Sequence, residues 1–272
     1  MNPLPVSFLT DFGLEDEFVG VCRAVIHSAD PEVKVIDVTH GIAAGDVRAG
    51  SIALASFVAY SSPAVHLAVV DPGVGTDRRA VALVAGDHFL VGPDNGLLIP
   101  AAQRLGGPSR AFEISNSPAR LTPTHRTFHG RDLFSPVAAE LTREVDPLEL
   151  GVEIDASGLV RIDLPVASLD GGHLTGHVLR ADRYGNVALN IGPGLILESF
   201  LRDGLVVEIA CAGKSLARVP FGSTFADVGP AEPILFTDSS GALSLAINRG
   251  DAVSRFALAP DQELQIRPAG PE

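Results

Sequence analysis

Cysteine, basic side chains and long apolar runs are scarce in this sequence, and each shortage excludes a class of protein. Only two cysteines are present, Cys22 and Cys211, which is too few for a disulfide framework or a cysteine-rich metal cluster. We interpret both as ordinary buried thiols, one in a helix and one in a strand. Unpaired thiols of this kind are typical of a reducing compartment.

Basic residues are outnumbered by acidic ones. The chain has 20 lysine and arginine residues against 33 aspartate and glutamate residues, a net charge of -13. Nucleic-acid binding relies on basic side chains that displace counterions, so we expect no nucleic-acid partner. A cationic or zwitterionic small molecule suits this charge better.

Nothing in the sequence resembles a membrane span or a signal peptide. No stretch reaches the roughly 18 uninterrupted apolar residues that a spanning helix requires. The N-terminal residues MNPLPVSFLTDFG lack a basic segment followed by a long apolar one. We therefore expect a cytoplasmic protein with no membrane partner.

What is present is enough apolar sequence for sizeable cores, since 46% of the 272 residues are hydrophobic. In the first half, β-rich runs alternate with helical patterns. Strands are predicted at 6–10, 33–38, 64–70, 80–84 and 89–91, and helices from Phe18 onward and at 46–60 and 132–142. This alternation predicts an α/β domain over residues 1–165, Rossmann-like, with a mostly parallel sheet.

The second half has a different character. Residues 163–172 (DLPVASLDGG) read as a linker, and β-rich runs follow at 174–180, 187–191, 205–210, 215–219, 234–236 and 243–247. Few helical stretches separate them. Short strands at this spacing predict an antiparallel second domain over residues 172–272, built as a barrel or a sandwich, with a barrel-like form preferred.

Two acids follow predicted parallel strands. Asp11 comes directly after the strand at 6–10, and Asp71 after the strand at 64–70. The carboxyl ends of parallel strands meet at one edge of a sheet, where ligands gather. A carboxylate there can accept two hydrogen bonds from a ribose diol, and Asp11 is the candidate for that role. Each acid taken alone is equally well explained as the cap of a turn or helix.

Three glycine-rich stretches accompany these acids: DPGVGT from Asp71, GPDNGL from Gly92 and TFHGRD from Thr127. None is a phosphate-binding fingerprint, because the third glycine of a dinucleotide loop and the GxxxxGK[ST] pattern are both missing. GPDNGL by itself is better read as a plain turn. His129, a structural residue if taken alone, gains interest beside Arg78 and Asp71, since together they can orient a water.

Longer motifs extend these signals over nearly the whole chain. They are TDFG, DVTHGI, VVDPGVGTDRR, VGPDNGL, TFHGRD, DRYGNVALNI, STFADVG and DSSGALSLAIN, in this order. In this order they resemble the SAM hydroxide adenosyltransferases, where SAM is S-adenosyl-L-methionine. These enzymes are related to the SAM-dependent fluorinating and chlorinating enzymes.

The resemblance implies roles for individual residues. The water-handling triad of that family falls on Asp71, Arg78 and His129, and its ribose-binding acid on Asp11. The other positions that the resemblance marks as substrate-binding are Asp16 and Asp182 at the methionine end, Tyr184, Asn186 and Phe225 at the adenine, Ser239 and Ser240 at the methionine carboxylate, and Thr127, Phe128 and Arg249. It also implies a homotrimer, in which the first domain of one chain and the second domain of the next share each site.

The motifs favour hydrolysis over halogenation. Halogenating relatives lack the acid at Asp71 and the imidazole at His129, and a carboxylate at Asp71 repels a bare halide while it can hold water. Gly45 and Ala188 stand where some halogenating relatives carry tryptophan. We therefore predict hydrolysis of SAM to adenosine and L-methionine by water attack at the ribose 5′ carbon, without a metal or other cofactor. Which triad member takes the proton stays open.

Two other classes remain as alternatives. A metal-dependent hydrolase would use hard ligands such as Asp11, Asp37, His40, Asp71 and His129, although their spacing matches no strong metal motif. A non-catalytic SAM or adenosine sensor would use the same pocket. Product formation from metal-free protein separates all three readings.

Overall fold

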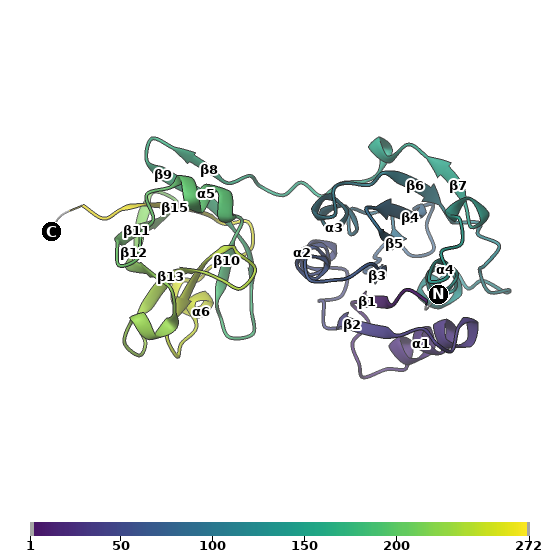
Figure 1. Ribbon diagram of the computed structural model, residues 1–272. Coiled ribbons are helices and arrows are strands. Elements are labelled where there is room, and N and C mark those ends of the chain that lie inside the picture. Colours follow the sequence, from purple (N-terminus) through teal and green to yellow (C-terminus); the bar gives the residue numbers. More distant parts are fainter. Residues whose placement is uncertain (1–2, 271–272) are drawn as a thin grey trace. The chain divides into compact units, whose positions relative to one another are not determined.

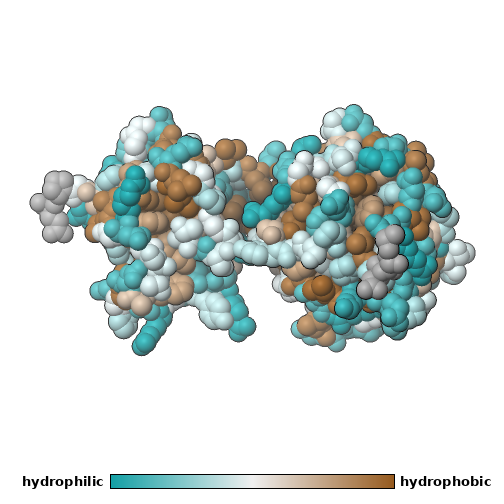
Figure 2. All heavy atoms as spheres, in the orientation of Figure 1, coloured by the Kyte–Doolittle hydropathy of each residue, from teal (hydrophilic) through white to brown (hydrophobic). Residues whose placement is uncertain are grey.

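The chain folds into two compact units, Met1–Ile162 and Asp163–Glu272, in a computed structural model that describes residues 3–270 (Figure 1). The first unit is α/β and the second is almost entirely β. Figure 2 shows hydrophilic and hydrophobic residues interspersed on the visible face of each unit. Large apolar side chains such as Phe8, Phe112 and Phe134 are fully buried inside the first unit.

A sheet in the order β2-β1-β3-β5-β4-β6-β7 forms the centre of the first unit. Its strands are β1 Val6–Thr10, β2 Val35–Thr39, β3 Val65–Val69, β4 Ala80–Ala85, β5 His88–Pro93, β6 Arg110–Glu113 and β7 Val152–Ile154. The strands run parallel from β2 to β5, whereas β4, β6 and β7 are joined antiparallel. The predicted Rossmann-like arrangement is confirmed. The antiparallel strand β4 forms a hairpin with β5, the last of the parallel strands, and β6 and β7 follow β4 at that side of the sheet.

Helices cover both faces of this sheet. They are α1 Phe18–Ala29, α2 Val47–Val58, α3 Ile99–Arg104 and α4 Ser135–Leu141, and a π-helical turn at Gly130–Phe134 leads into α4; short 3-10 turns lie at Pro147–Glu149 and Ala156–Gly158. Side chains of α1 and α4 pack with Phe8 and Leu67, while those of α2 and α3 pack with Leu9 and Ala68. Because neighbouring residues of a strand face opposite ways, β1 and β3 are buried along their whole length.

The second unit is a closed barrel. Its strands are β8 Ser168–Asp170, β9 His173–Ala181, β10 Val187–Leu189, β11 Val206–Cys211, β12 Lys214–Gly222, β13 Pro233–Thr237, β14 Leu243–Ile247 and β15 Glu263–Pro268; the short helices are α5 Pro193–Glu198 and α6 Ala252–Phe256, with a 3-10 turn at Phe225–Asp227. The order is β10-β14-β13-β12-β11-β15-β9, and a β9–β10 pairing closes the ring. Because the ring is closed, these strands have no free edge. Of the two predicted forms, the second unit is therefore a barrel and not a sandwich.

Two details of the second unit differ from the sequence prediction. The segment 163–172 is not a linker throughout, because Ser168–Asp170 forms β8 and pairs with β9. The barrel is also not purely antiparallel, since β12 and β13 run parallel at Phe221 and Gly222. The long β12 pairs with β11 over its first part and with β13 at its end, so it joins the two sides of the barrel.

Within residues 3–270, every helix is too short or too polar to traverse a lipid bilayer. Both cysteines carry free thiols. Cys22 lies buried in α1, and this burial raises the pKa of its thiol to about 11. Such a thiol is a poor nucleophile at neutral pH.

A buried histidine pair connects three strands of the first unit. The Ser7 hydroxyl contacts His66 Nδ1 at 2.7 Å, and His66 Nε2 contacts His88 Nδ1 at 3.0 Å. His66 is fully buried, and burial, followed by the nearby His88, lowers the pKa of its imidazole from 6.5 to about 3. Both rings are therefore held neutral in the folded protein, since burial lowers the pKa of His88 as well.

This pair predicts loss of stability in acid. In the unfolded chain His66 binds a proton below pH 6.5, whereas in the folded chain it stays neutral down to about pH 3. Acid therefore stabilises the unfolded state relative to the folded one, and the free energy of unfolding falls as the pH drops through 6.5. We expect the free energy of unfolding to fall by about 2 kcal/mol from pH 7 to 5 through His66 alone. Denaturant unfolding of His66→Gln should show a shallower pH slope. The exposed His27→Gln serves as control, and equal slopes in all three proteins would contradict this.

Candidate active site

The carboxyl edge of the parallel strands brings two of the predicted site residues together. β1 and β3 are parallel neighbours with Thr10 opposite Val69, so Asp11 and Asp71 leave the sheet at the same edge. One oxygen of Asp11 accepts a hydrogen bond of 2.8 Å from the Gly45 backbone N–H. That bond fixes the carboxylate against the loop that follows β2.

Asp71 and Arg78 form a buried ion pair. The Arg78 Nε donates to one carboxylate oxygen of Asp71 at 3.1 Å, and an Arg78 terminal nitrogen donates to the other. The two side chains are only 5% and 8% exposed. A two-pronged pair fixes the carboxylate plane as well as its position.

His129 completes the predicted triad. An Arg78 terminal nitrogen lies 3.2 Å from His129 Nδ1. Because a guanidinium can only donate, Nδ1 must be the acceptor, and the ring proton then resides on Nε2. Burial, followed by the charge of Arg78, lowers the pKa of His129, which keeps the ring neutral. The structure therefore presents His129 as a donor through Nε2.

The loops that carry these residues are tied to each other at Gly75. The Arg126 guanidinium donates to the Gly75 carbonyl at 2.9 Å. Gly75 has φ +79°, and a Cβ there would lie 2.8 Å from the Arg126 carbonyl oxygen. Only glycine permits both this conformation and this close approach, so Gly75 allows the loop after Asp71 to pack against the segment that precedes His129.

Buried Asp132 stabilises the loop before His129. Its carboxylate accepts hydrogen bonds from the His125 backbone N–H and from Arg131, and the His125 ring contacts both side chains. Burial opposes ionisation of Asp132, but the bonds from Arg131 and His125 outweigh it and lower its pKa. Asp132 and Arg131 were not among the predicted site residues, although they belong to the TFHGRD motif. Both residues lie in a π-helical turn, and turns of this type are frequent at functional sites.

An aromatic cluster lies beside the triad. The rings of Phe12, Phe18 and Phe128 meet edge to face, with centroids 5.3 to 6.2 Å apart. Of the other predicted residues in this unit, Thr127 and Asp16 are exposed, on the loops next to Phe128 and Phe18. These loops place an apolar surface next to polar side chains.

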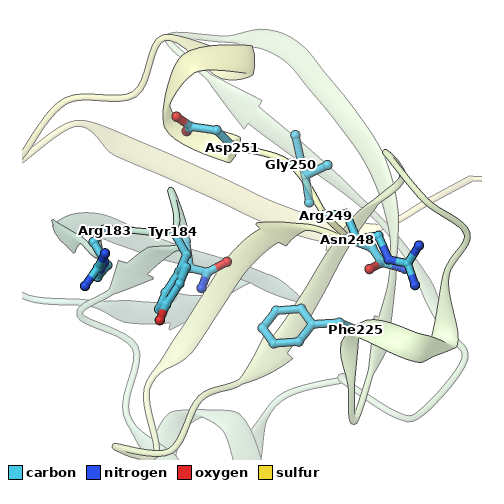
Figure 3. Close-up of a pocket in the computed structure, with 9 residues that line it drawn as sticks. Arg183, Tyr184, Phe225, Asn248, Arg249, Gly250 and Asp251 are labelled. Atoms are coloured by element: carbon cyan, nitrogen blue, oxygen red, sulfur yellow. The ribbon is translucent and has the colours of Figure 1, made fainter.

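A separate pocket lies on the barrel and gathers the residues predicted for adenine. It has a volume of about 720 Å³, and its lining residues are Arg183, Tyr184, Asn186, Phe225, Ile247, Asn248, Arg249, Gly250 and Asp251. The Phe225 ring extends into it toward Tyr184 (Figure 3). Tyr184 is 70% exposed and Phe225 is 41% exposed. Exposed aromatic faces of this kind suit stacking with a planar base.

Arg249 lies at this pocket in an uncommon conformation. Its φ is +57°, in the left-handed region that non-glycine residues rarely adopt. The peptide before it is held by Asn248, whose side chain donates to the Val228 carbonyl at 2.8 Å. Strain of this type is often found where backbone groups face a ligand.

A smaller pocket of about 270 Å³ adjoins the first and shares Asn186 and Phe225 with it. Asp182 and Ser239 line this pocket, as does Asp238, which the predicted set lacked. The DSSG motif is the signal that would have included Asp238.

Asp182 and Asp238 both organise their own turns. The Asp182 carboxylate accepts from the backbone N–H of Tyr184, from the backbone N–H of Asn186 and from its side-chain amide. Asp238 accepts from the Ser240 and Ser244 hydroxyls at 2.6 and 2.8 Å. Burial would raise the pKa of Asp238, but these bonds outweigh it and lower the pKa. Predicted Ser240 is thus bonded to Asp238.

The hard-ligand residues considered from the sequence have other partners. Asp71 and His129 both contact Arg78, and Asp37 pairs with Arg23 and with His40. Among residues 3–270, no three histidine, cysteine or acidic side chains gather in an arrangement suited to a metal ion.

Both halves of the chain match the models of one known family. Residues 6–151 match the SAM hydroxide adenosyltransferase N-terminal domain, and residues 176–265 match the SAM hydroxide adenosyltransferase C-terminal domain. The chain belongs to this family. Each matched segment lies within one of the two units found in the structure.

Individual relatives are similar to this chain over nearly their full length. A protein named (R)-S-adenosyl-L-methionine hydrolase from Salinispora tropica is 45% identical, covering 98% of this chain and 99% of that protein. A fluorinase from Actinoplanes sp. is more distant, at 26% identity and 91% of each chain. A crystal structure of an uncharacterized conserved protein from Thermotoga maritima is 32% identical with a TM-score of 0.91, covering 96% and 99%.

The Arg78 to His129 contact predicts an acid-shifted histidine. We expect His129 to titrate below the ordinary value of 6.5, and Arg78→Met to raise its pKa because a nearby positive charge is removed. Histidine ring signals followed by NMR over pH 4 to 8 measure this, with His129→Gln assigning the signal. A wild-type midpoint at or above 6.5 would contradict the geometry.

Proposed function

We propose that this protein hydrolyses S-adenosyl-L-methionine to adenosine and L-methionine. The observation that carries the proposal is the buried Asp71–Arg78 ion pair with His129 bonded to it, in a chain that belongs to this family. The 45% identical relative bears the name of a hydrolase that acts on (R)-S-adenosyl-L-methionine. We take that sulfonium configuration as the preferred substrate.

The proposed reaction is a substitution at the ribose 5′ carbon. A water oxygen forms the bond to this carbon as the carbon–sulfur bond breaks, and the bonding pair moves to the positive sulfur, which leaves as the neutral thioether of methionine. One water proton is released. Since the leaving group is already activated, the protein chiefly has to orient the water in line with the breaking bond.

Asp71 is the proposed proton acceptor. Arg78 cannot accept a proton, and the His129 Nδ1 lone pair already faces Arg78 while Nε2 carries hydrogen. Each Asp71 oxygen receives Arg78 on one side and retains lone-pair capacity on the other. We propose that the water donates to Asp71 and accepts from His129 Nε2. No metal or other cofactor takes part in this scheme.

The remaining roles follow the family resemblance. Asp11 is proposed to accept the two ribose hydroxyls, and Asp16 to face the methionine ammonium. On the barrel, the larger pocket with Tyr184 and Phe225 is proposed for adenine and the smaller one beside Ser239 for the methionine end. The exposed aromatic rings support the first of these assignments.

We further propose a homotrimer in the cytoplasm, with each site shared between the first unit of one subunit and the second unit of the next. The free thiols support a reducing compartment. Light scattering coupled to size-exclusion chromatography should give a trimer or a multiple of it. A fully active monomer would contradict a shared site.

The activity itself is tested with metal-stripped protein. We expect adenosine and L-methionine from (R)-S-adenosyl-L-methionine, at a rate unchanged by chelator, with slower turnover of the other sulfonium epimer. Chromatography of the products decides the outcome. Binding without product would identify a sensor, loss of activity with chelator a metal enzyme, and halide-dependent formation of a 5′-halogenated nucleoside a halogenase.

A pair of variants tests the acceptor. Asp71→Asn keeps the shape but removes the charge, so kcat should fall by about 10²-fold or more while the substrate dissociation constant changes little. His129→Gln retains an N–H donor and should lose less. Single-turnover rates at saturating substrate, with binding measured by calorimetry, make the comparison. An Asp71→Asn enzyme of near wild-type rate, or a larger loss in His129→Gln, would exclude Asp71 as acceptor.

A further inference from the structure

Asp94 and Asn95 of the GPDNGL stretch contact the loop that carries the Asp71–Arg78 ion pair. In the sheet, β5 stands between β3 and β4. The loop 70–79 leaves β3 and enters β4, so it must cross the carboxyl end of β5, where Asp94 and Asn95 follow Pro93. Taken by itself, GPDNGL was predicted to be a plain turn, and neither Asp94 nor Asn95 was among the predicted site residues.

Asn95 holds the start of the crossing loop. Its side-chain amide donates to the Val70 carbonyl at 2.8 Å, and its side-chain oxygen accepts from the Leu97 backbone N–H at 3.2 Å. Val70 is the residue directly before Asp71. The Asn95 amide therefore fixes the peptide from which the Asp71 side chain extends.

Asp94 holds the end of the same loop. Its backbone N–H donates to the Arg79 carbonyl at 2.9 Å, and its carboxylate accepts two bonds from the Arg79 guanidinium at 2.6 and 2.9 Å. Arg78 uses the same carbonyl, because a terminal nitrogen donates to the Arg79 oxygen at 3.1 Å. The Arg79 peptide thus links Asp94 to the guanidinium that pairs with Asp71.

Asp94 is itself held in place by a second set of contacts. The second carboxylate oxygen of Asp94 accepts from the Val160 backbone N–H at 2.9 Å, and its side chain is only 4% exposed. Gly92 lets β5 approach β3 closely, since a Cβ there would lie 2.3 Å from the Ala68 carbonyl oxygen. Burial and these bonds keep Asp94 inside the protein.

We propose that Asp94 and Asn95 are positioning residues, which clamp both ends of loop 70–79 and so set the geometry of Asp71 and Arg78 toward His129. The kinetic part of this inference rests on the proposed function. A clamp of this kind acts on the rate rather than on substrate affinity, because a displacement of about 1 Å in a reacting group can cost about 10²-fold in rate.

Asn95→Ala tests the clamp, and Asn190→Ala is its matched control. The Asn190 amide also bridges two backbone groups, donating to the Pro165 carbonyl and accepting from the His177 N–H at 2.7 Å each, but it does so on the barrel unit. Both variants lose the same kind of interaction. Thermal unfolding shows whether their losses of stability are comparable.

We expect Asn95→Ala to lower kcat at least about tenfold while the substrate dissociation constant stays within about threefold. Asn190→Ala should keep wild-type kcat per folded protein. Asn95→Ser retains an acceptor for the Leu97 N–H without the amide donor, and it supplies the same readouts if the alanine variant does not fold. A kcat within about twofold of wild type, or an equal loss in the control, overturns the proposal.

A second readout is independent of turnover. If the clamp holds Arg78 against His129, Asn95→Ala should raise the pKa of His129 toward 6.5 in an NMR titration, whereas Asn190→Ala should leave it unchanged. If wild-type protein fails to hydrolyse the substrate, the proposed function fails and this titration alone decides the clamp. An unchanged His129 pKa in Asn95→Ala and Asn95→Ser overturns it.

Discussion

The guanidinium of Arg78 is the group on which the geometry of the first unit's site depends. Its nitrogens donate to both oxygens of Asp71, to the Arg79 carbonyl and to His129 Nδ1. A single planar cation therefore fixes a carboxylate, a ring tautomer and a backbone peptide at once. Lysine could not replace it, because an ammonium lacks the rigid fork that binds both carboxylate oxygens. The charge balance also matters, since an unpaired Asp71 at this burial would be costly.

The sheet makes this arrangement attainable. Parallel strands deliver Asp11 and Asp71 to one edge, while the change to antiparallel pairing at β4 forces the loop 70–79 over the end of β5. A loop of this length would be mobile if it were held only at its two strand junctions. Here the loop also forms hydrogen bonds with Asp94 and Asn95, which follow β5, and with Arg126. Preorganisation of this kind lowers the reorganisation needed when a reaction develops charge.

The strand and helix periodicity of the sequence predicted much of the fold. It missed elements whose own residues carry only a weak strand or helix pattern. The fully buried β1 and β3 were predicted almost to the residue because uninterrupted β-rich runs mark them. In contrast, β15 alternates buried and exposed residues in a run with three charged or amide side chains, and α3 has only 6 residues with a proline near its start. Both elements are defined by tertiary packing rather than by their own sequence. Closure of the barrel depends on the β9–β10 pairing, which no local pattern reports.

The same limit applies to the candidate site, where residue type alone did not show which acids have free hydrogen-bonding capacity and which build a turn. Asp182 accepts three bonds from its own turn, so of about four lone-pair sites on a carboxylate only one remains for a substrate. Asp11 has a described bond only from Gly45 and retains more capacity. A sequence motif records that an acid is required at each position, but the local donors decide what it can bind. Asp11 therefore retains more capacity for substrate hydroxyl groups than Asp182, whose carboxylate mainly shapes its own turn beside the pocket.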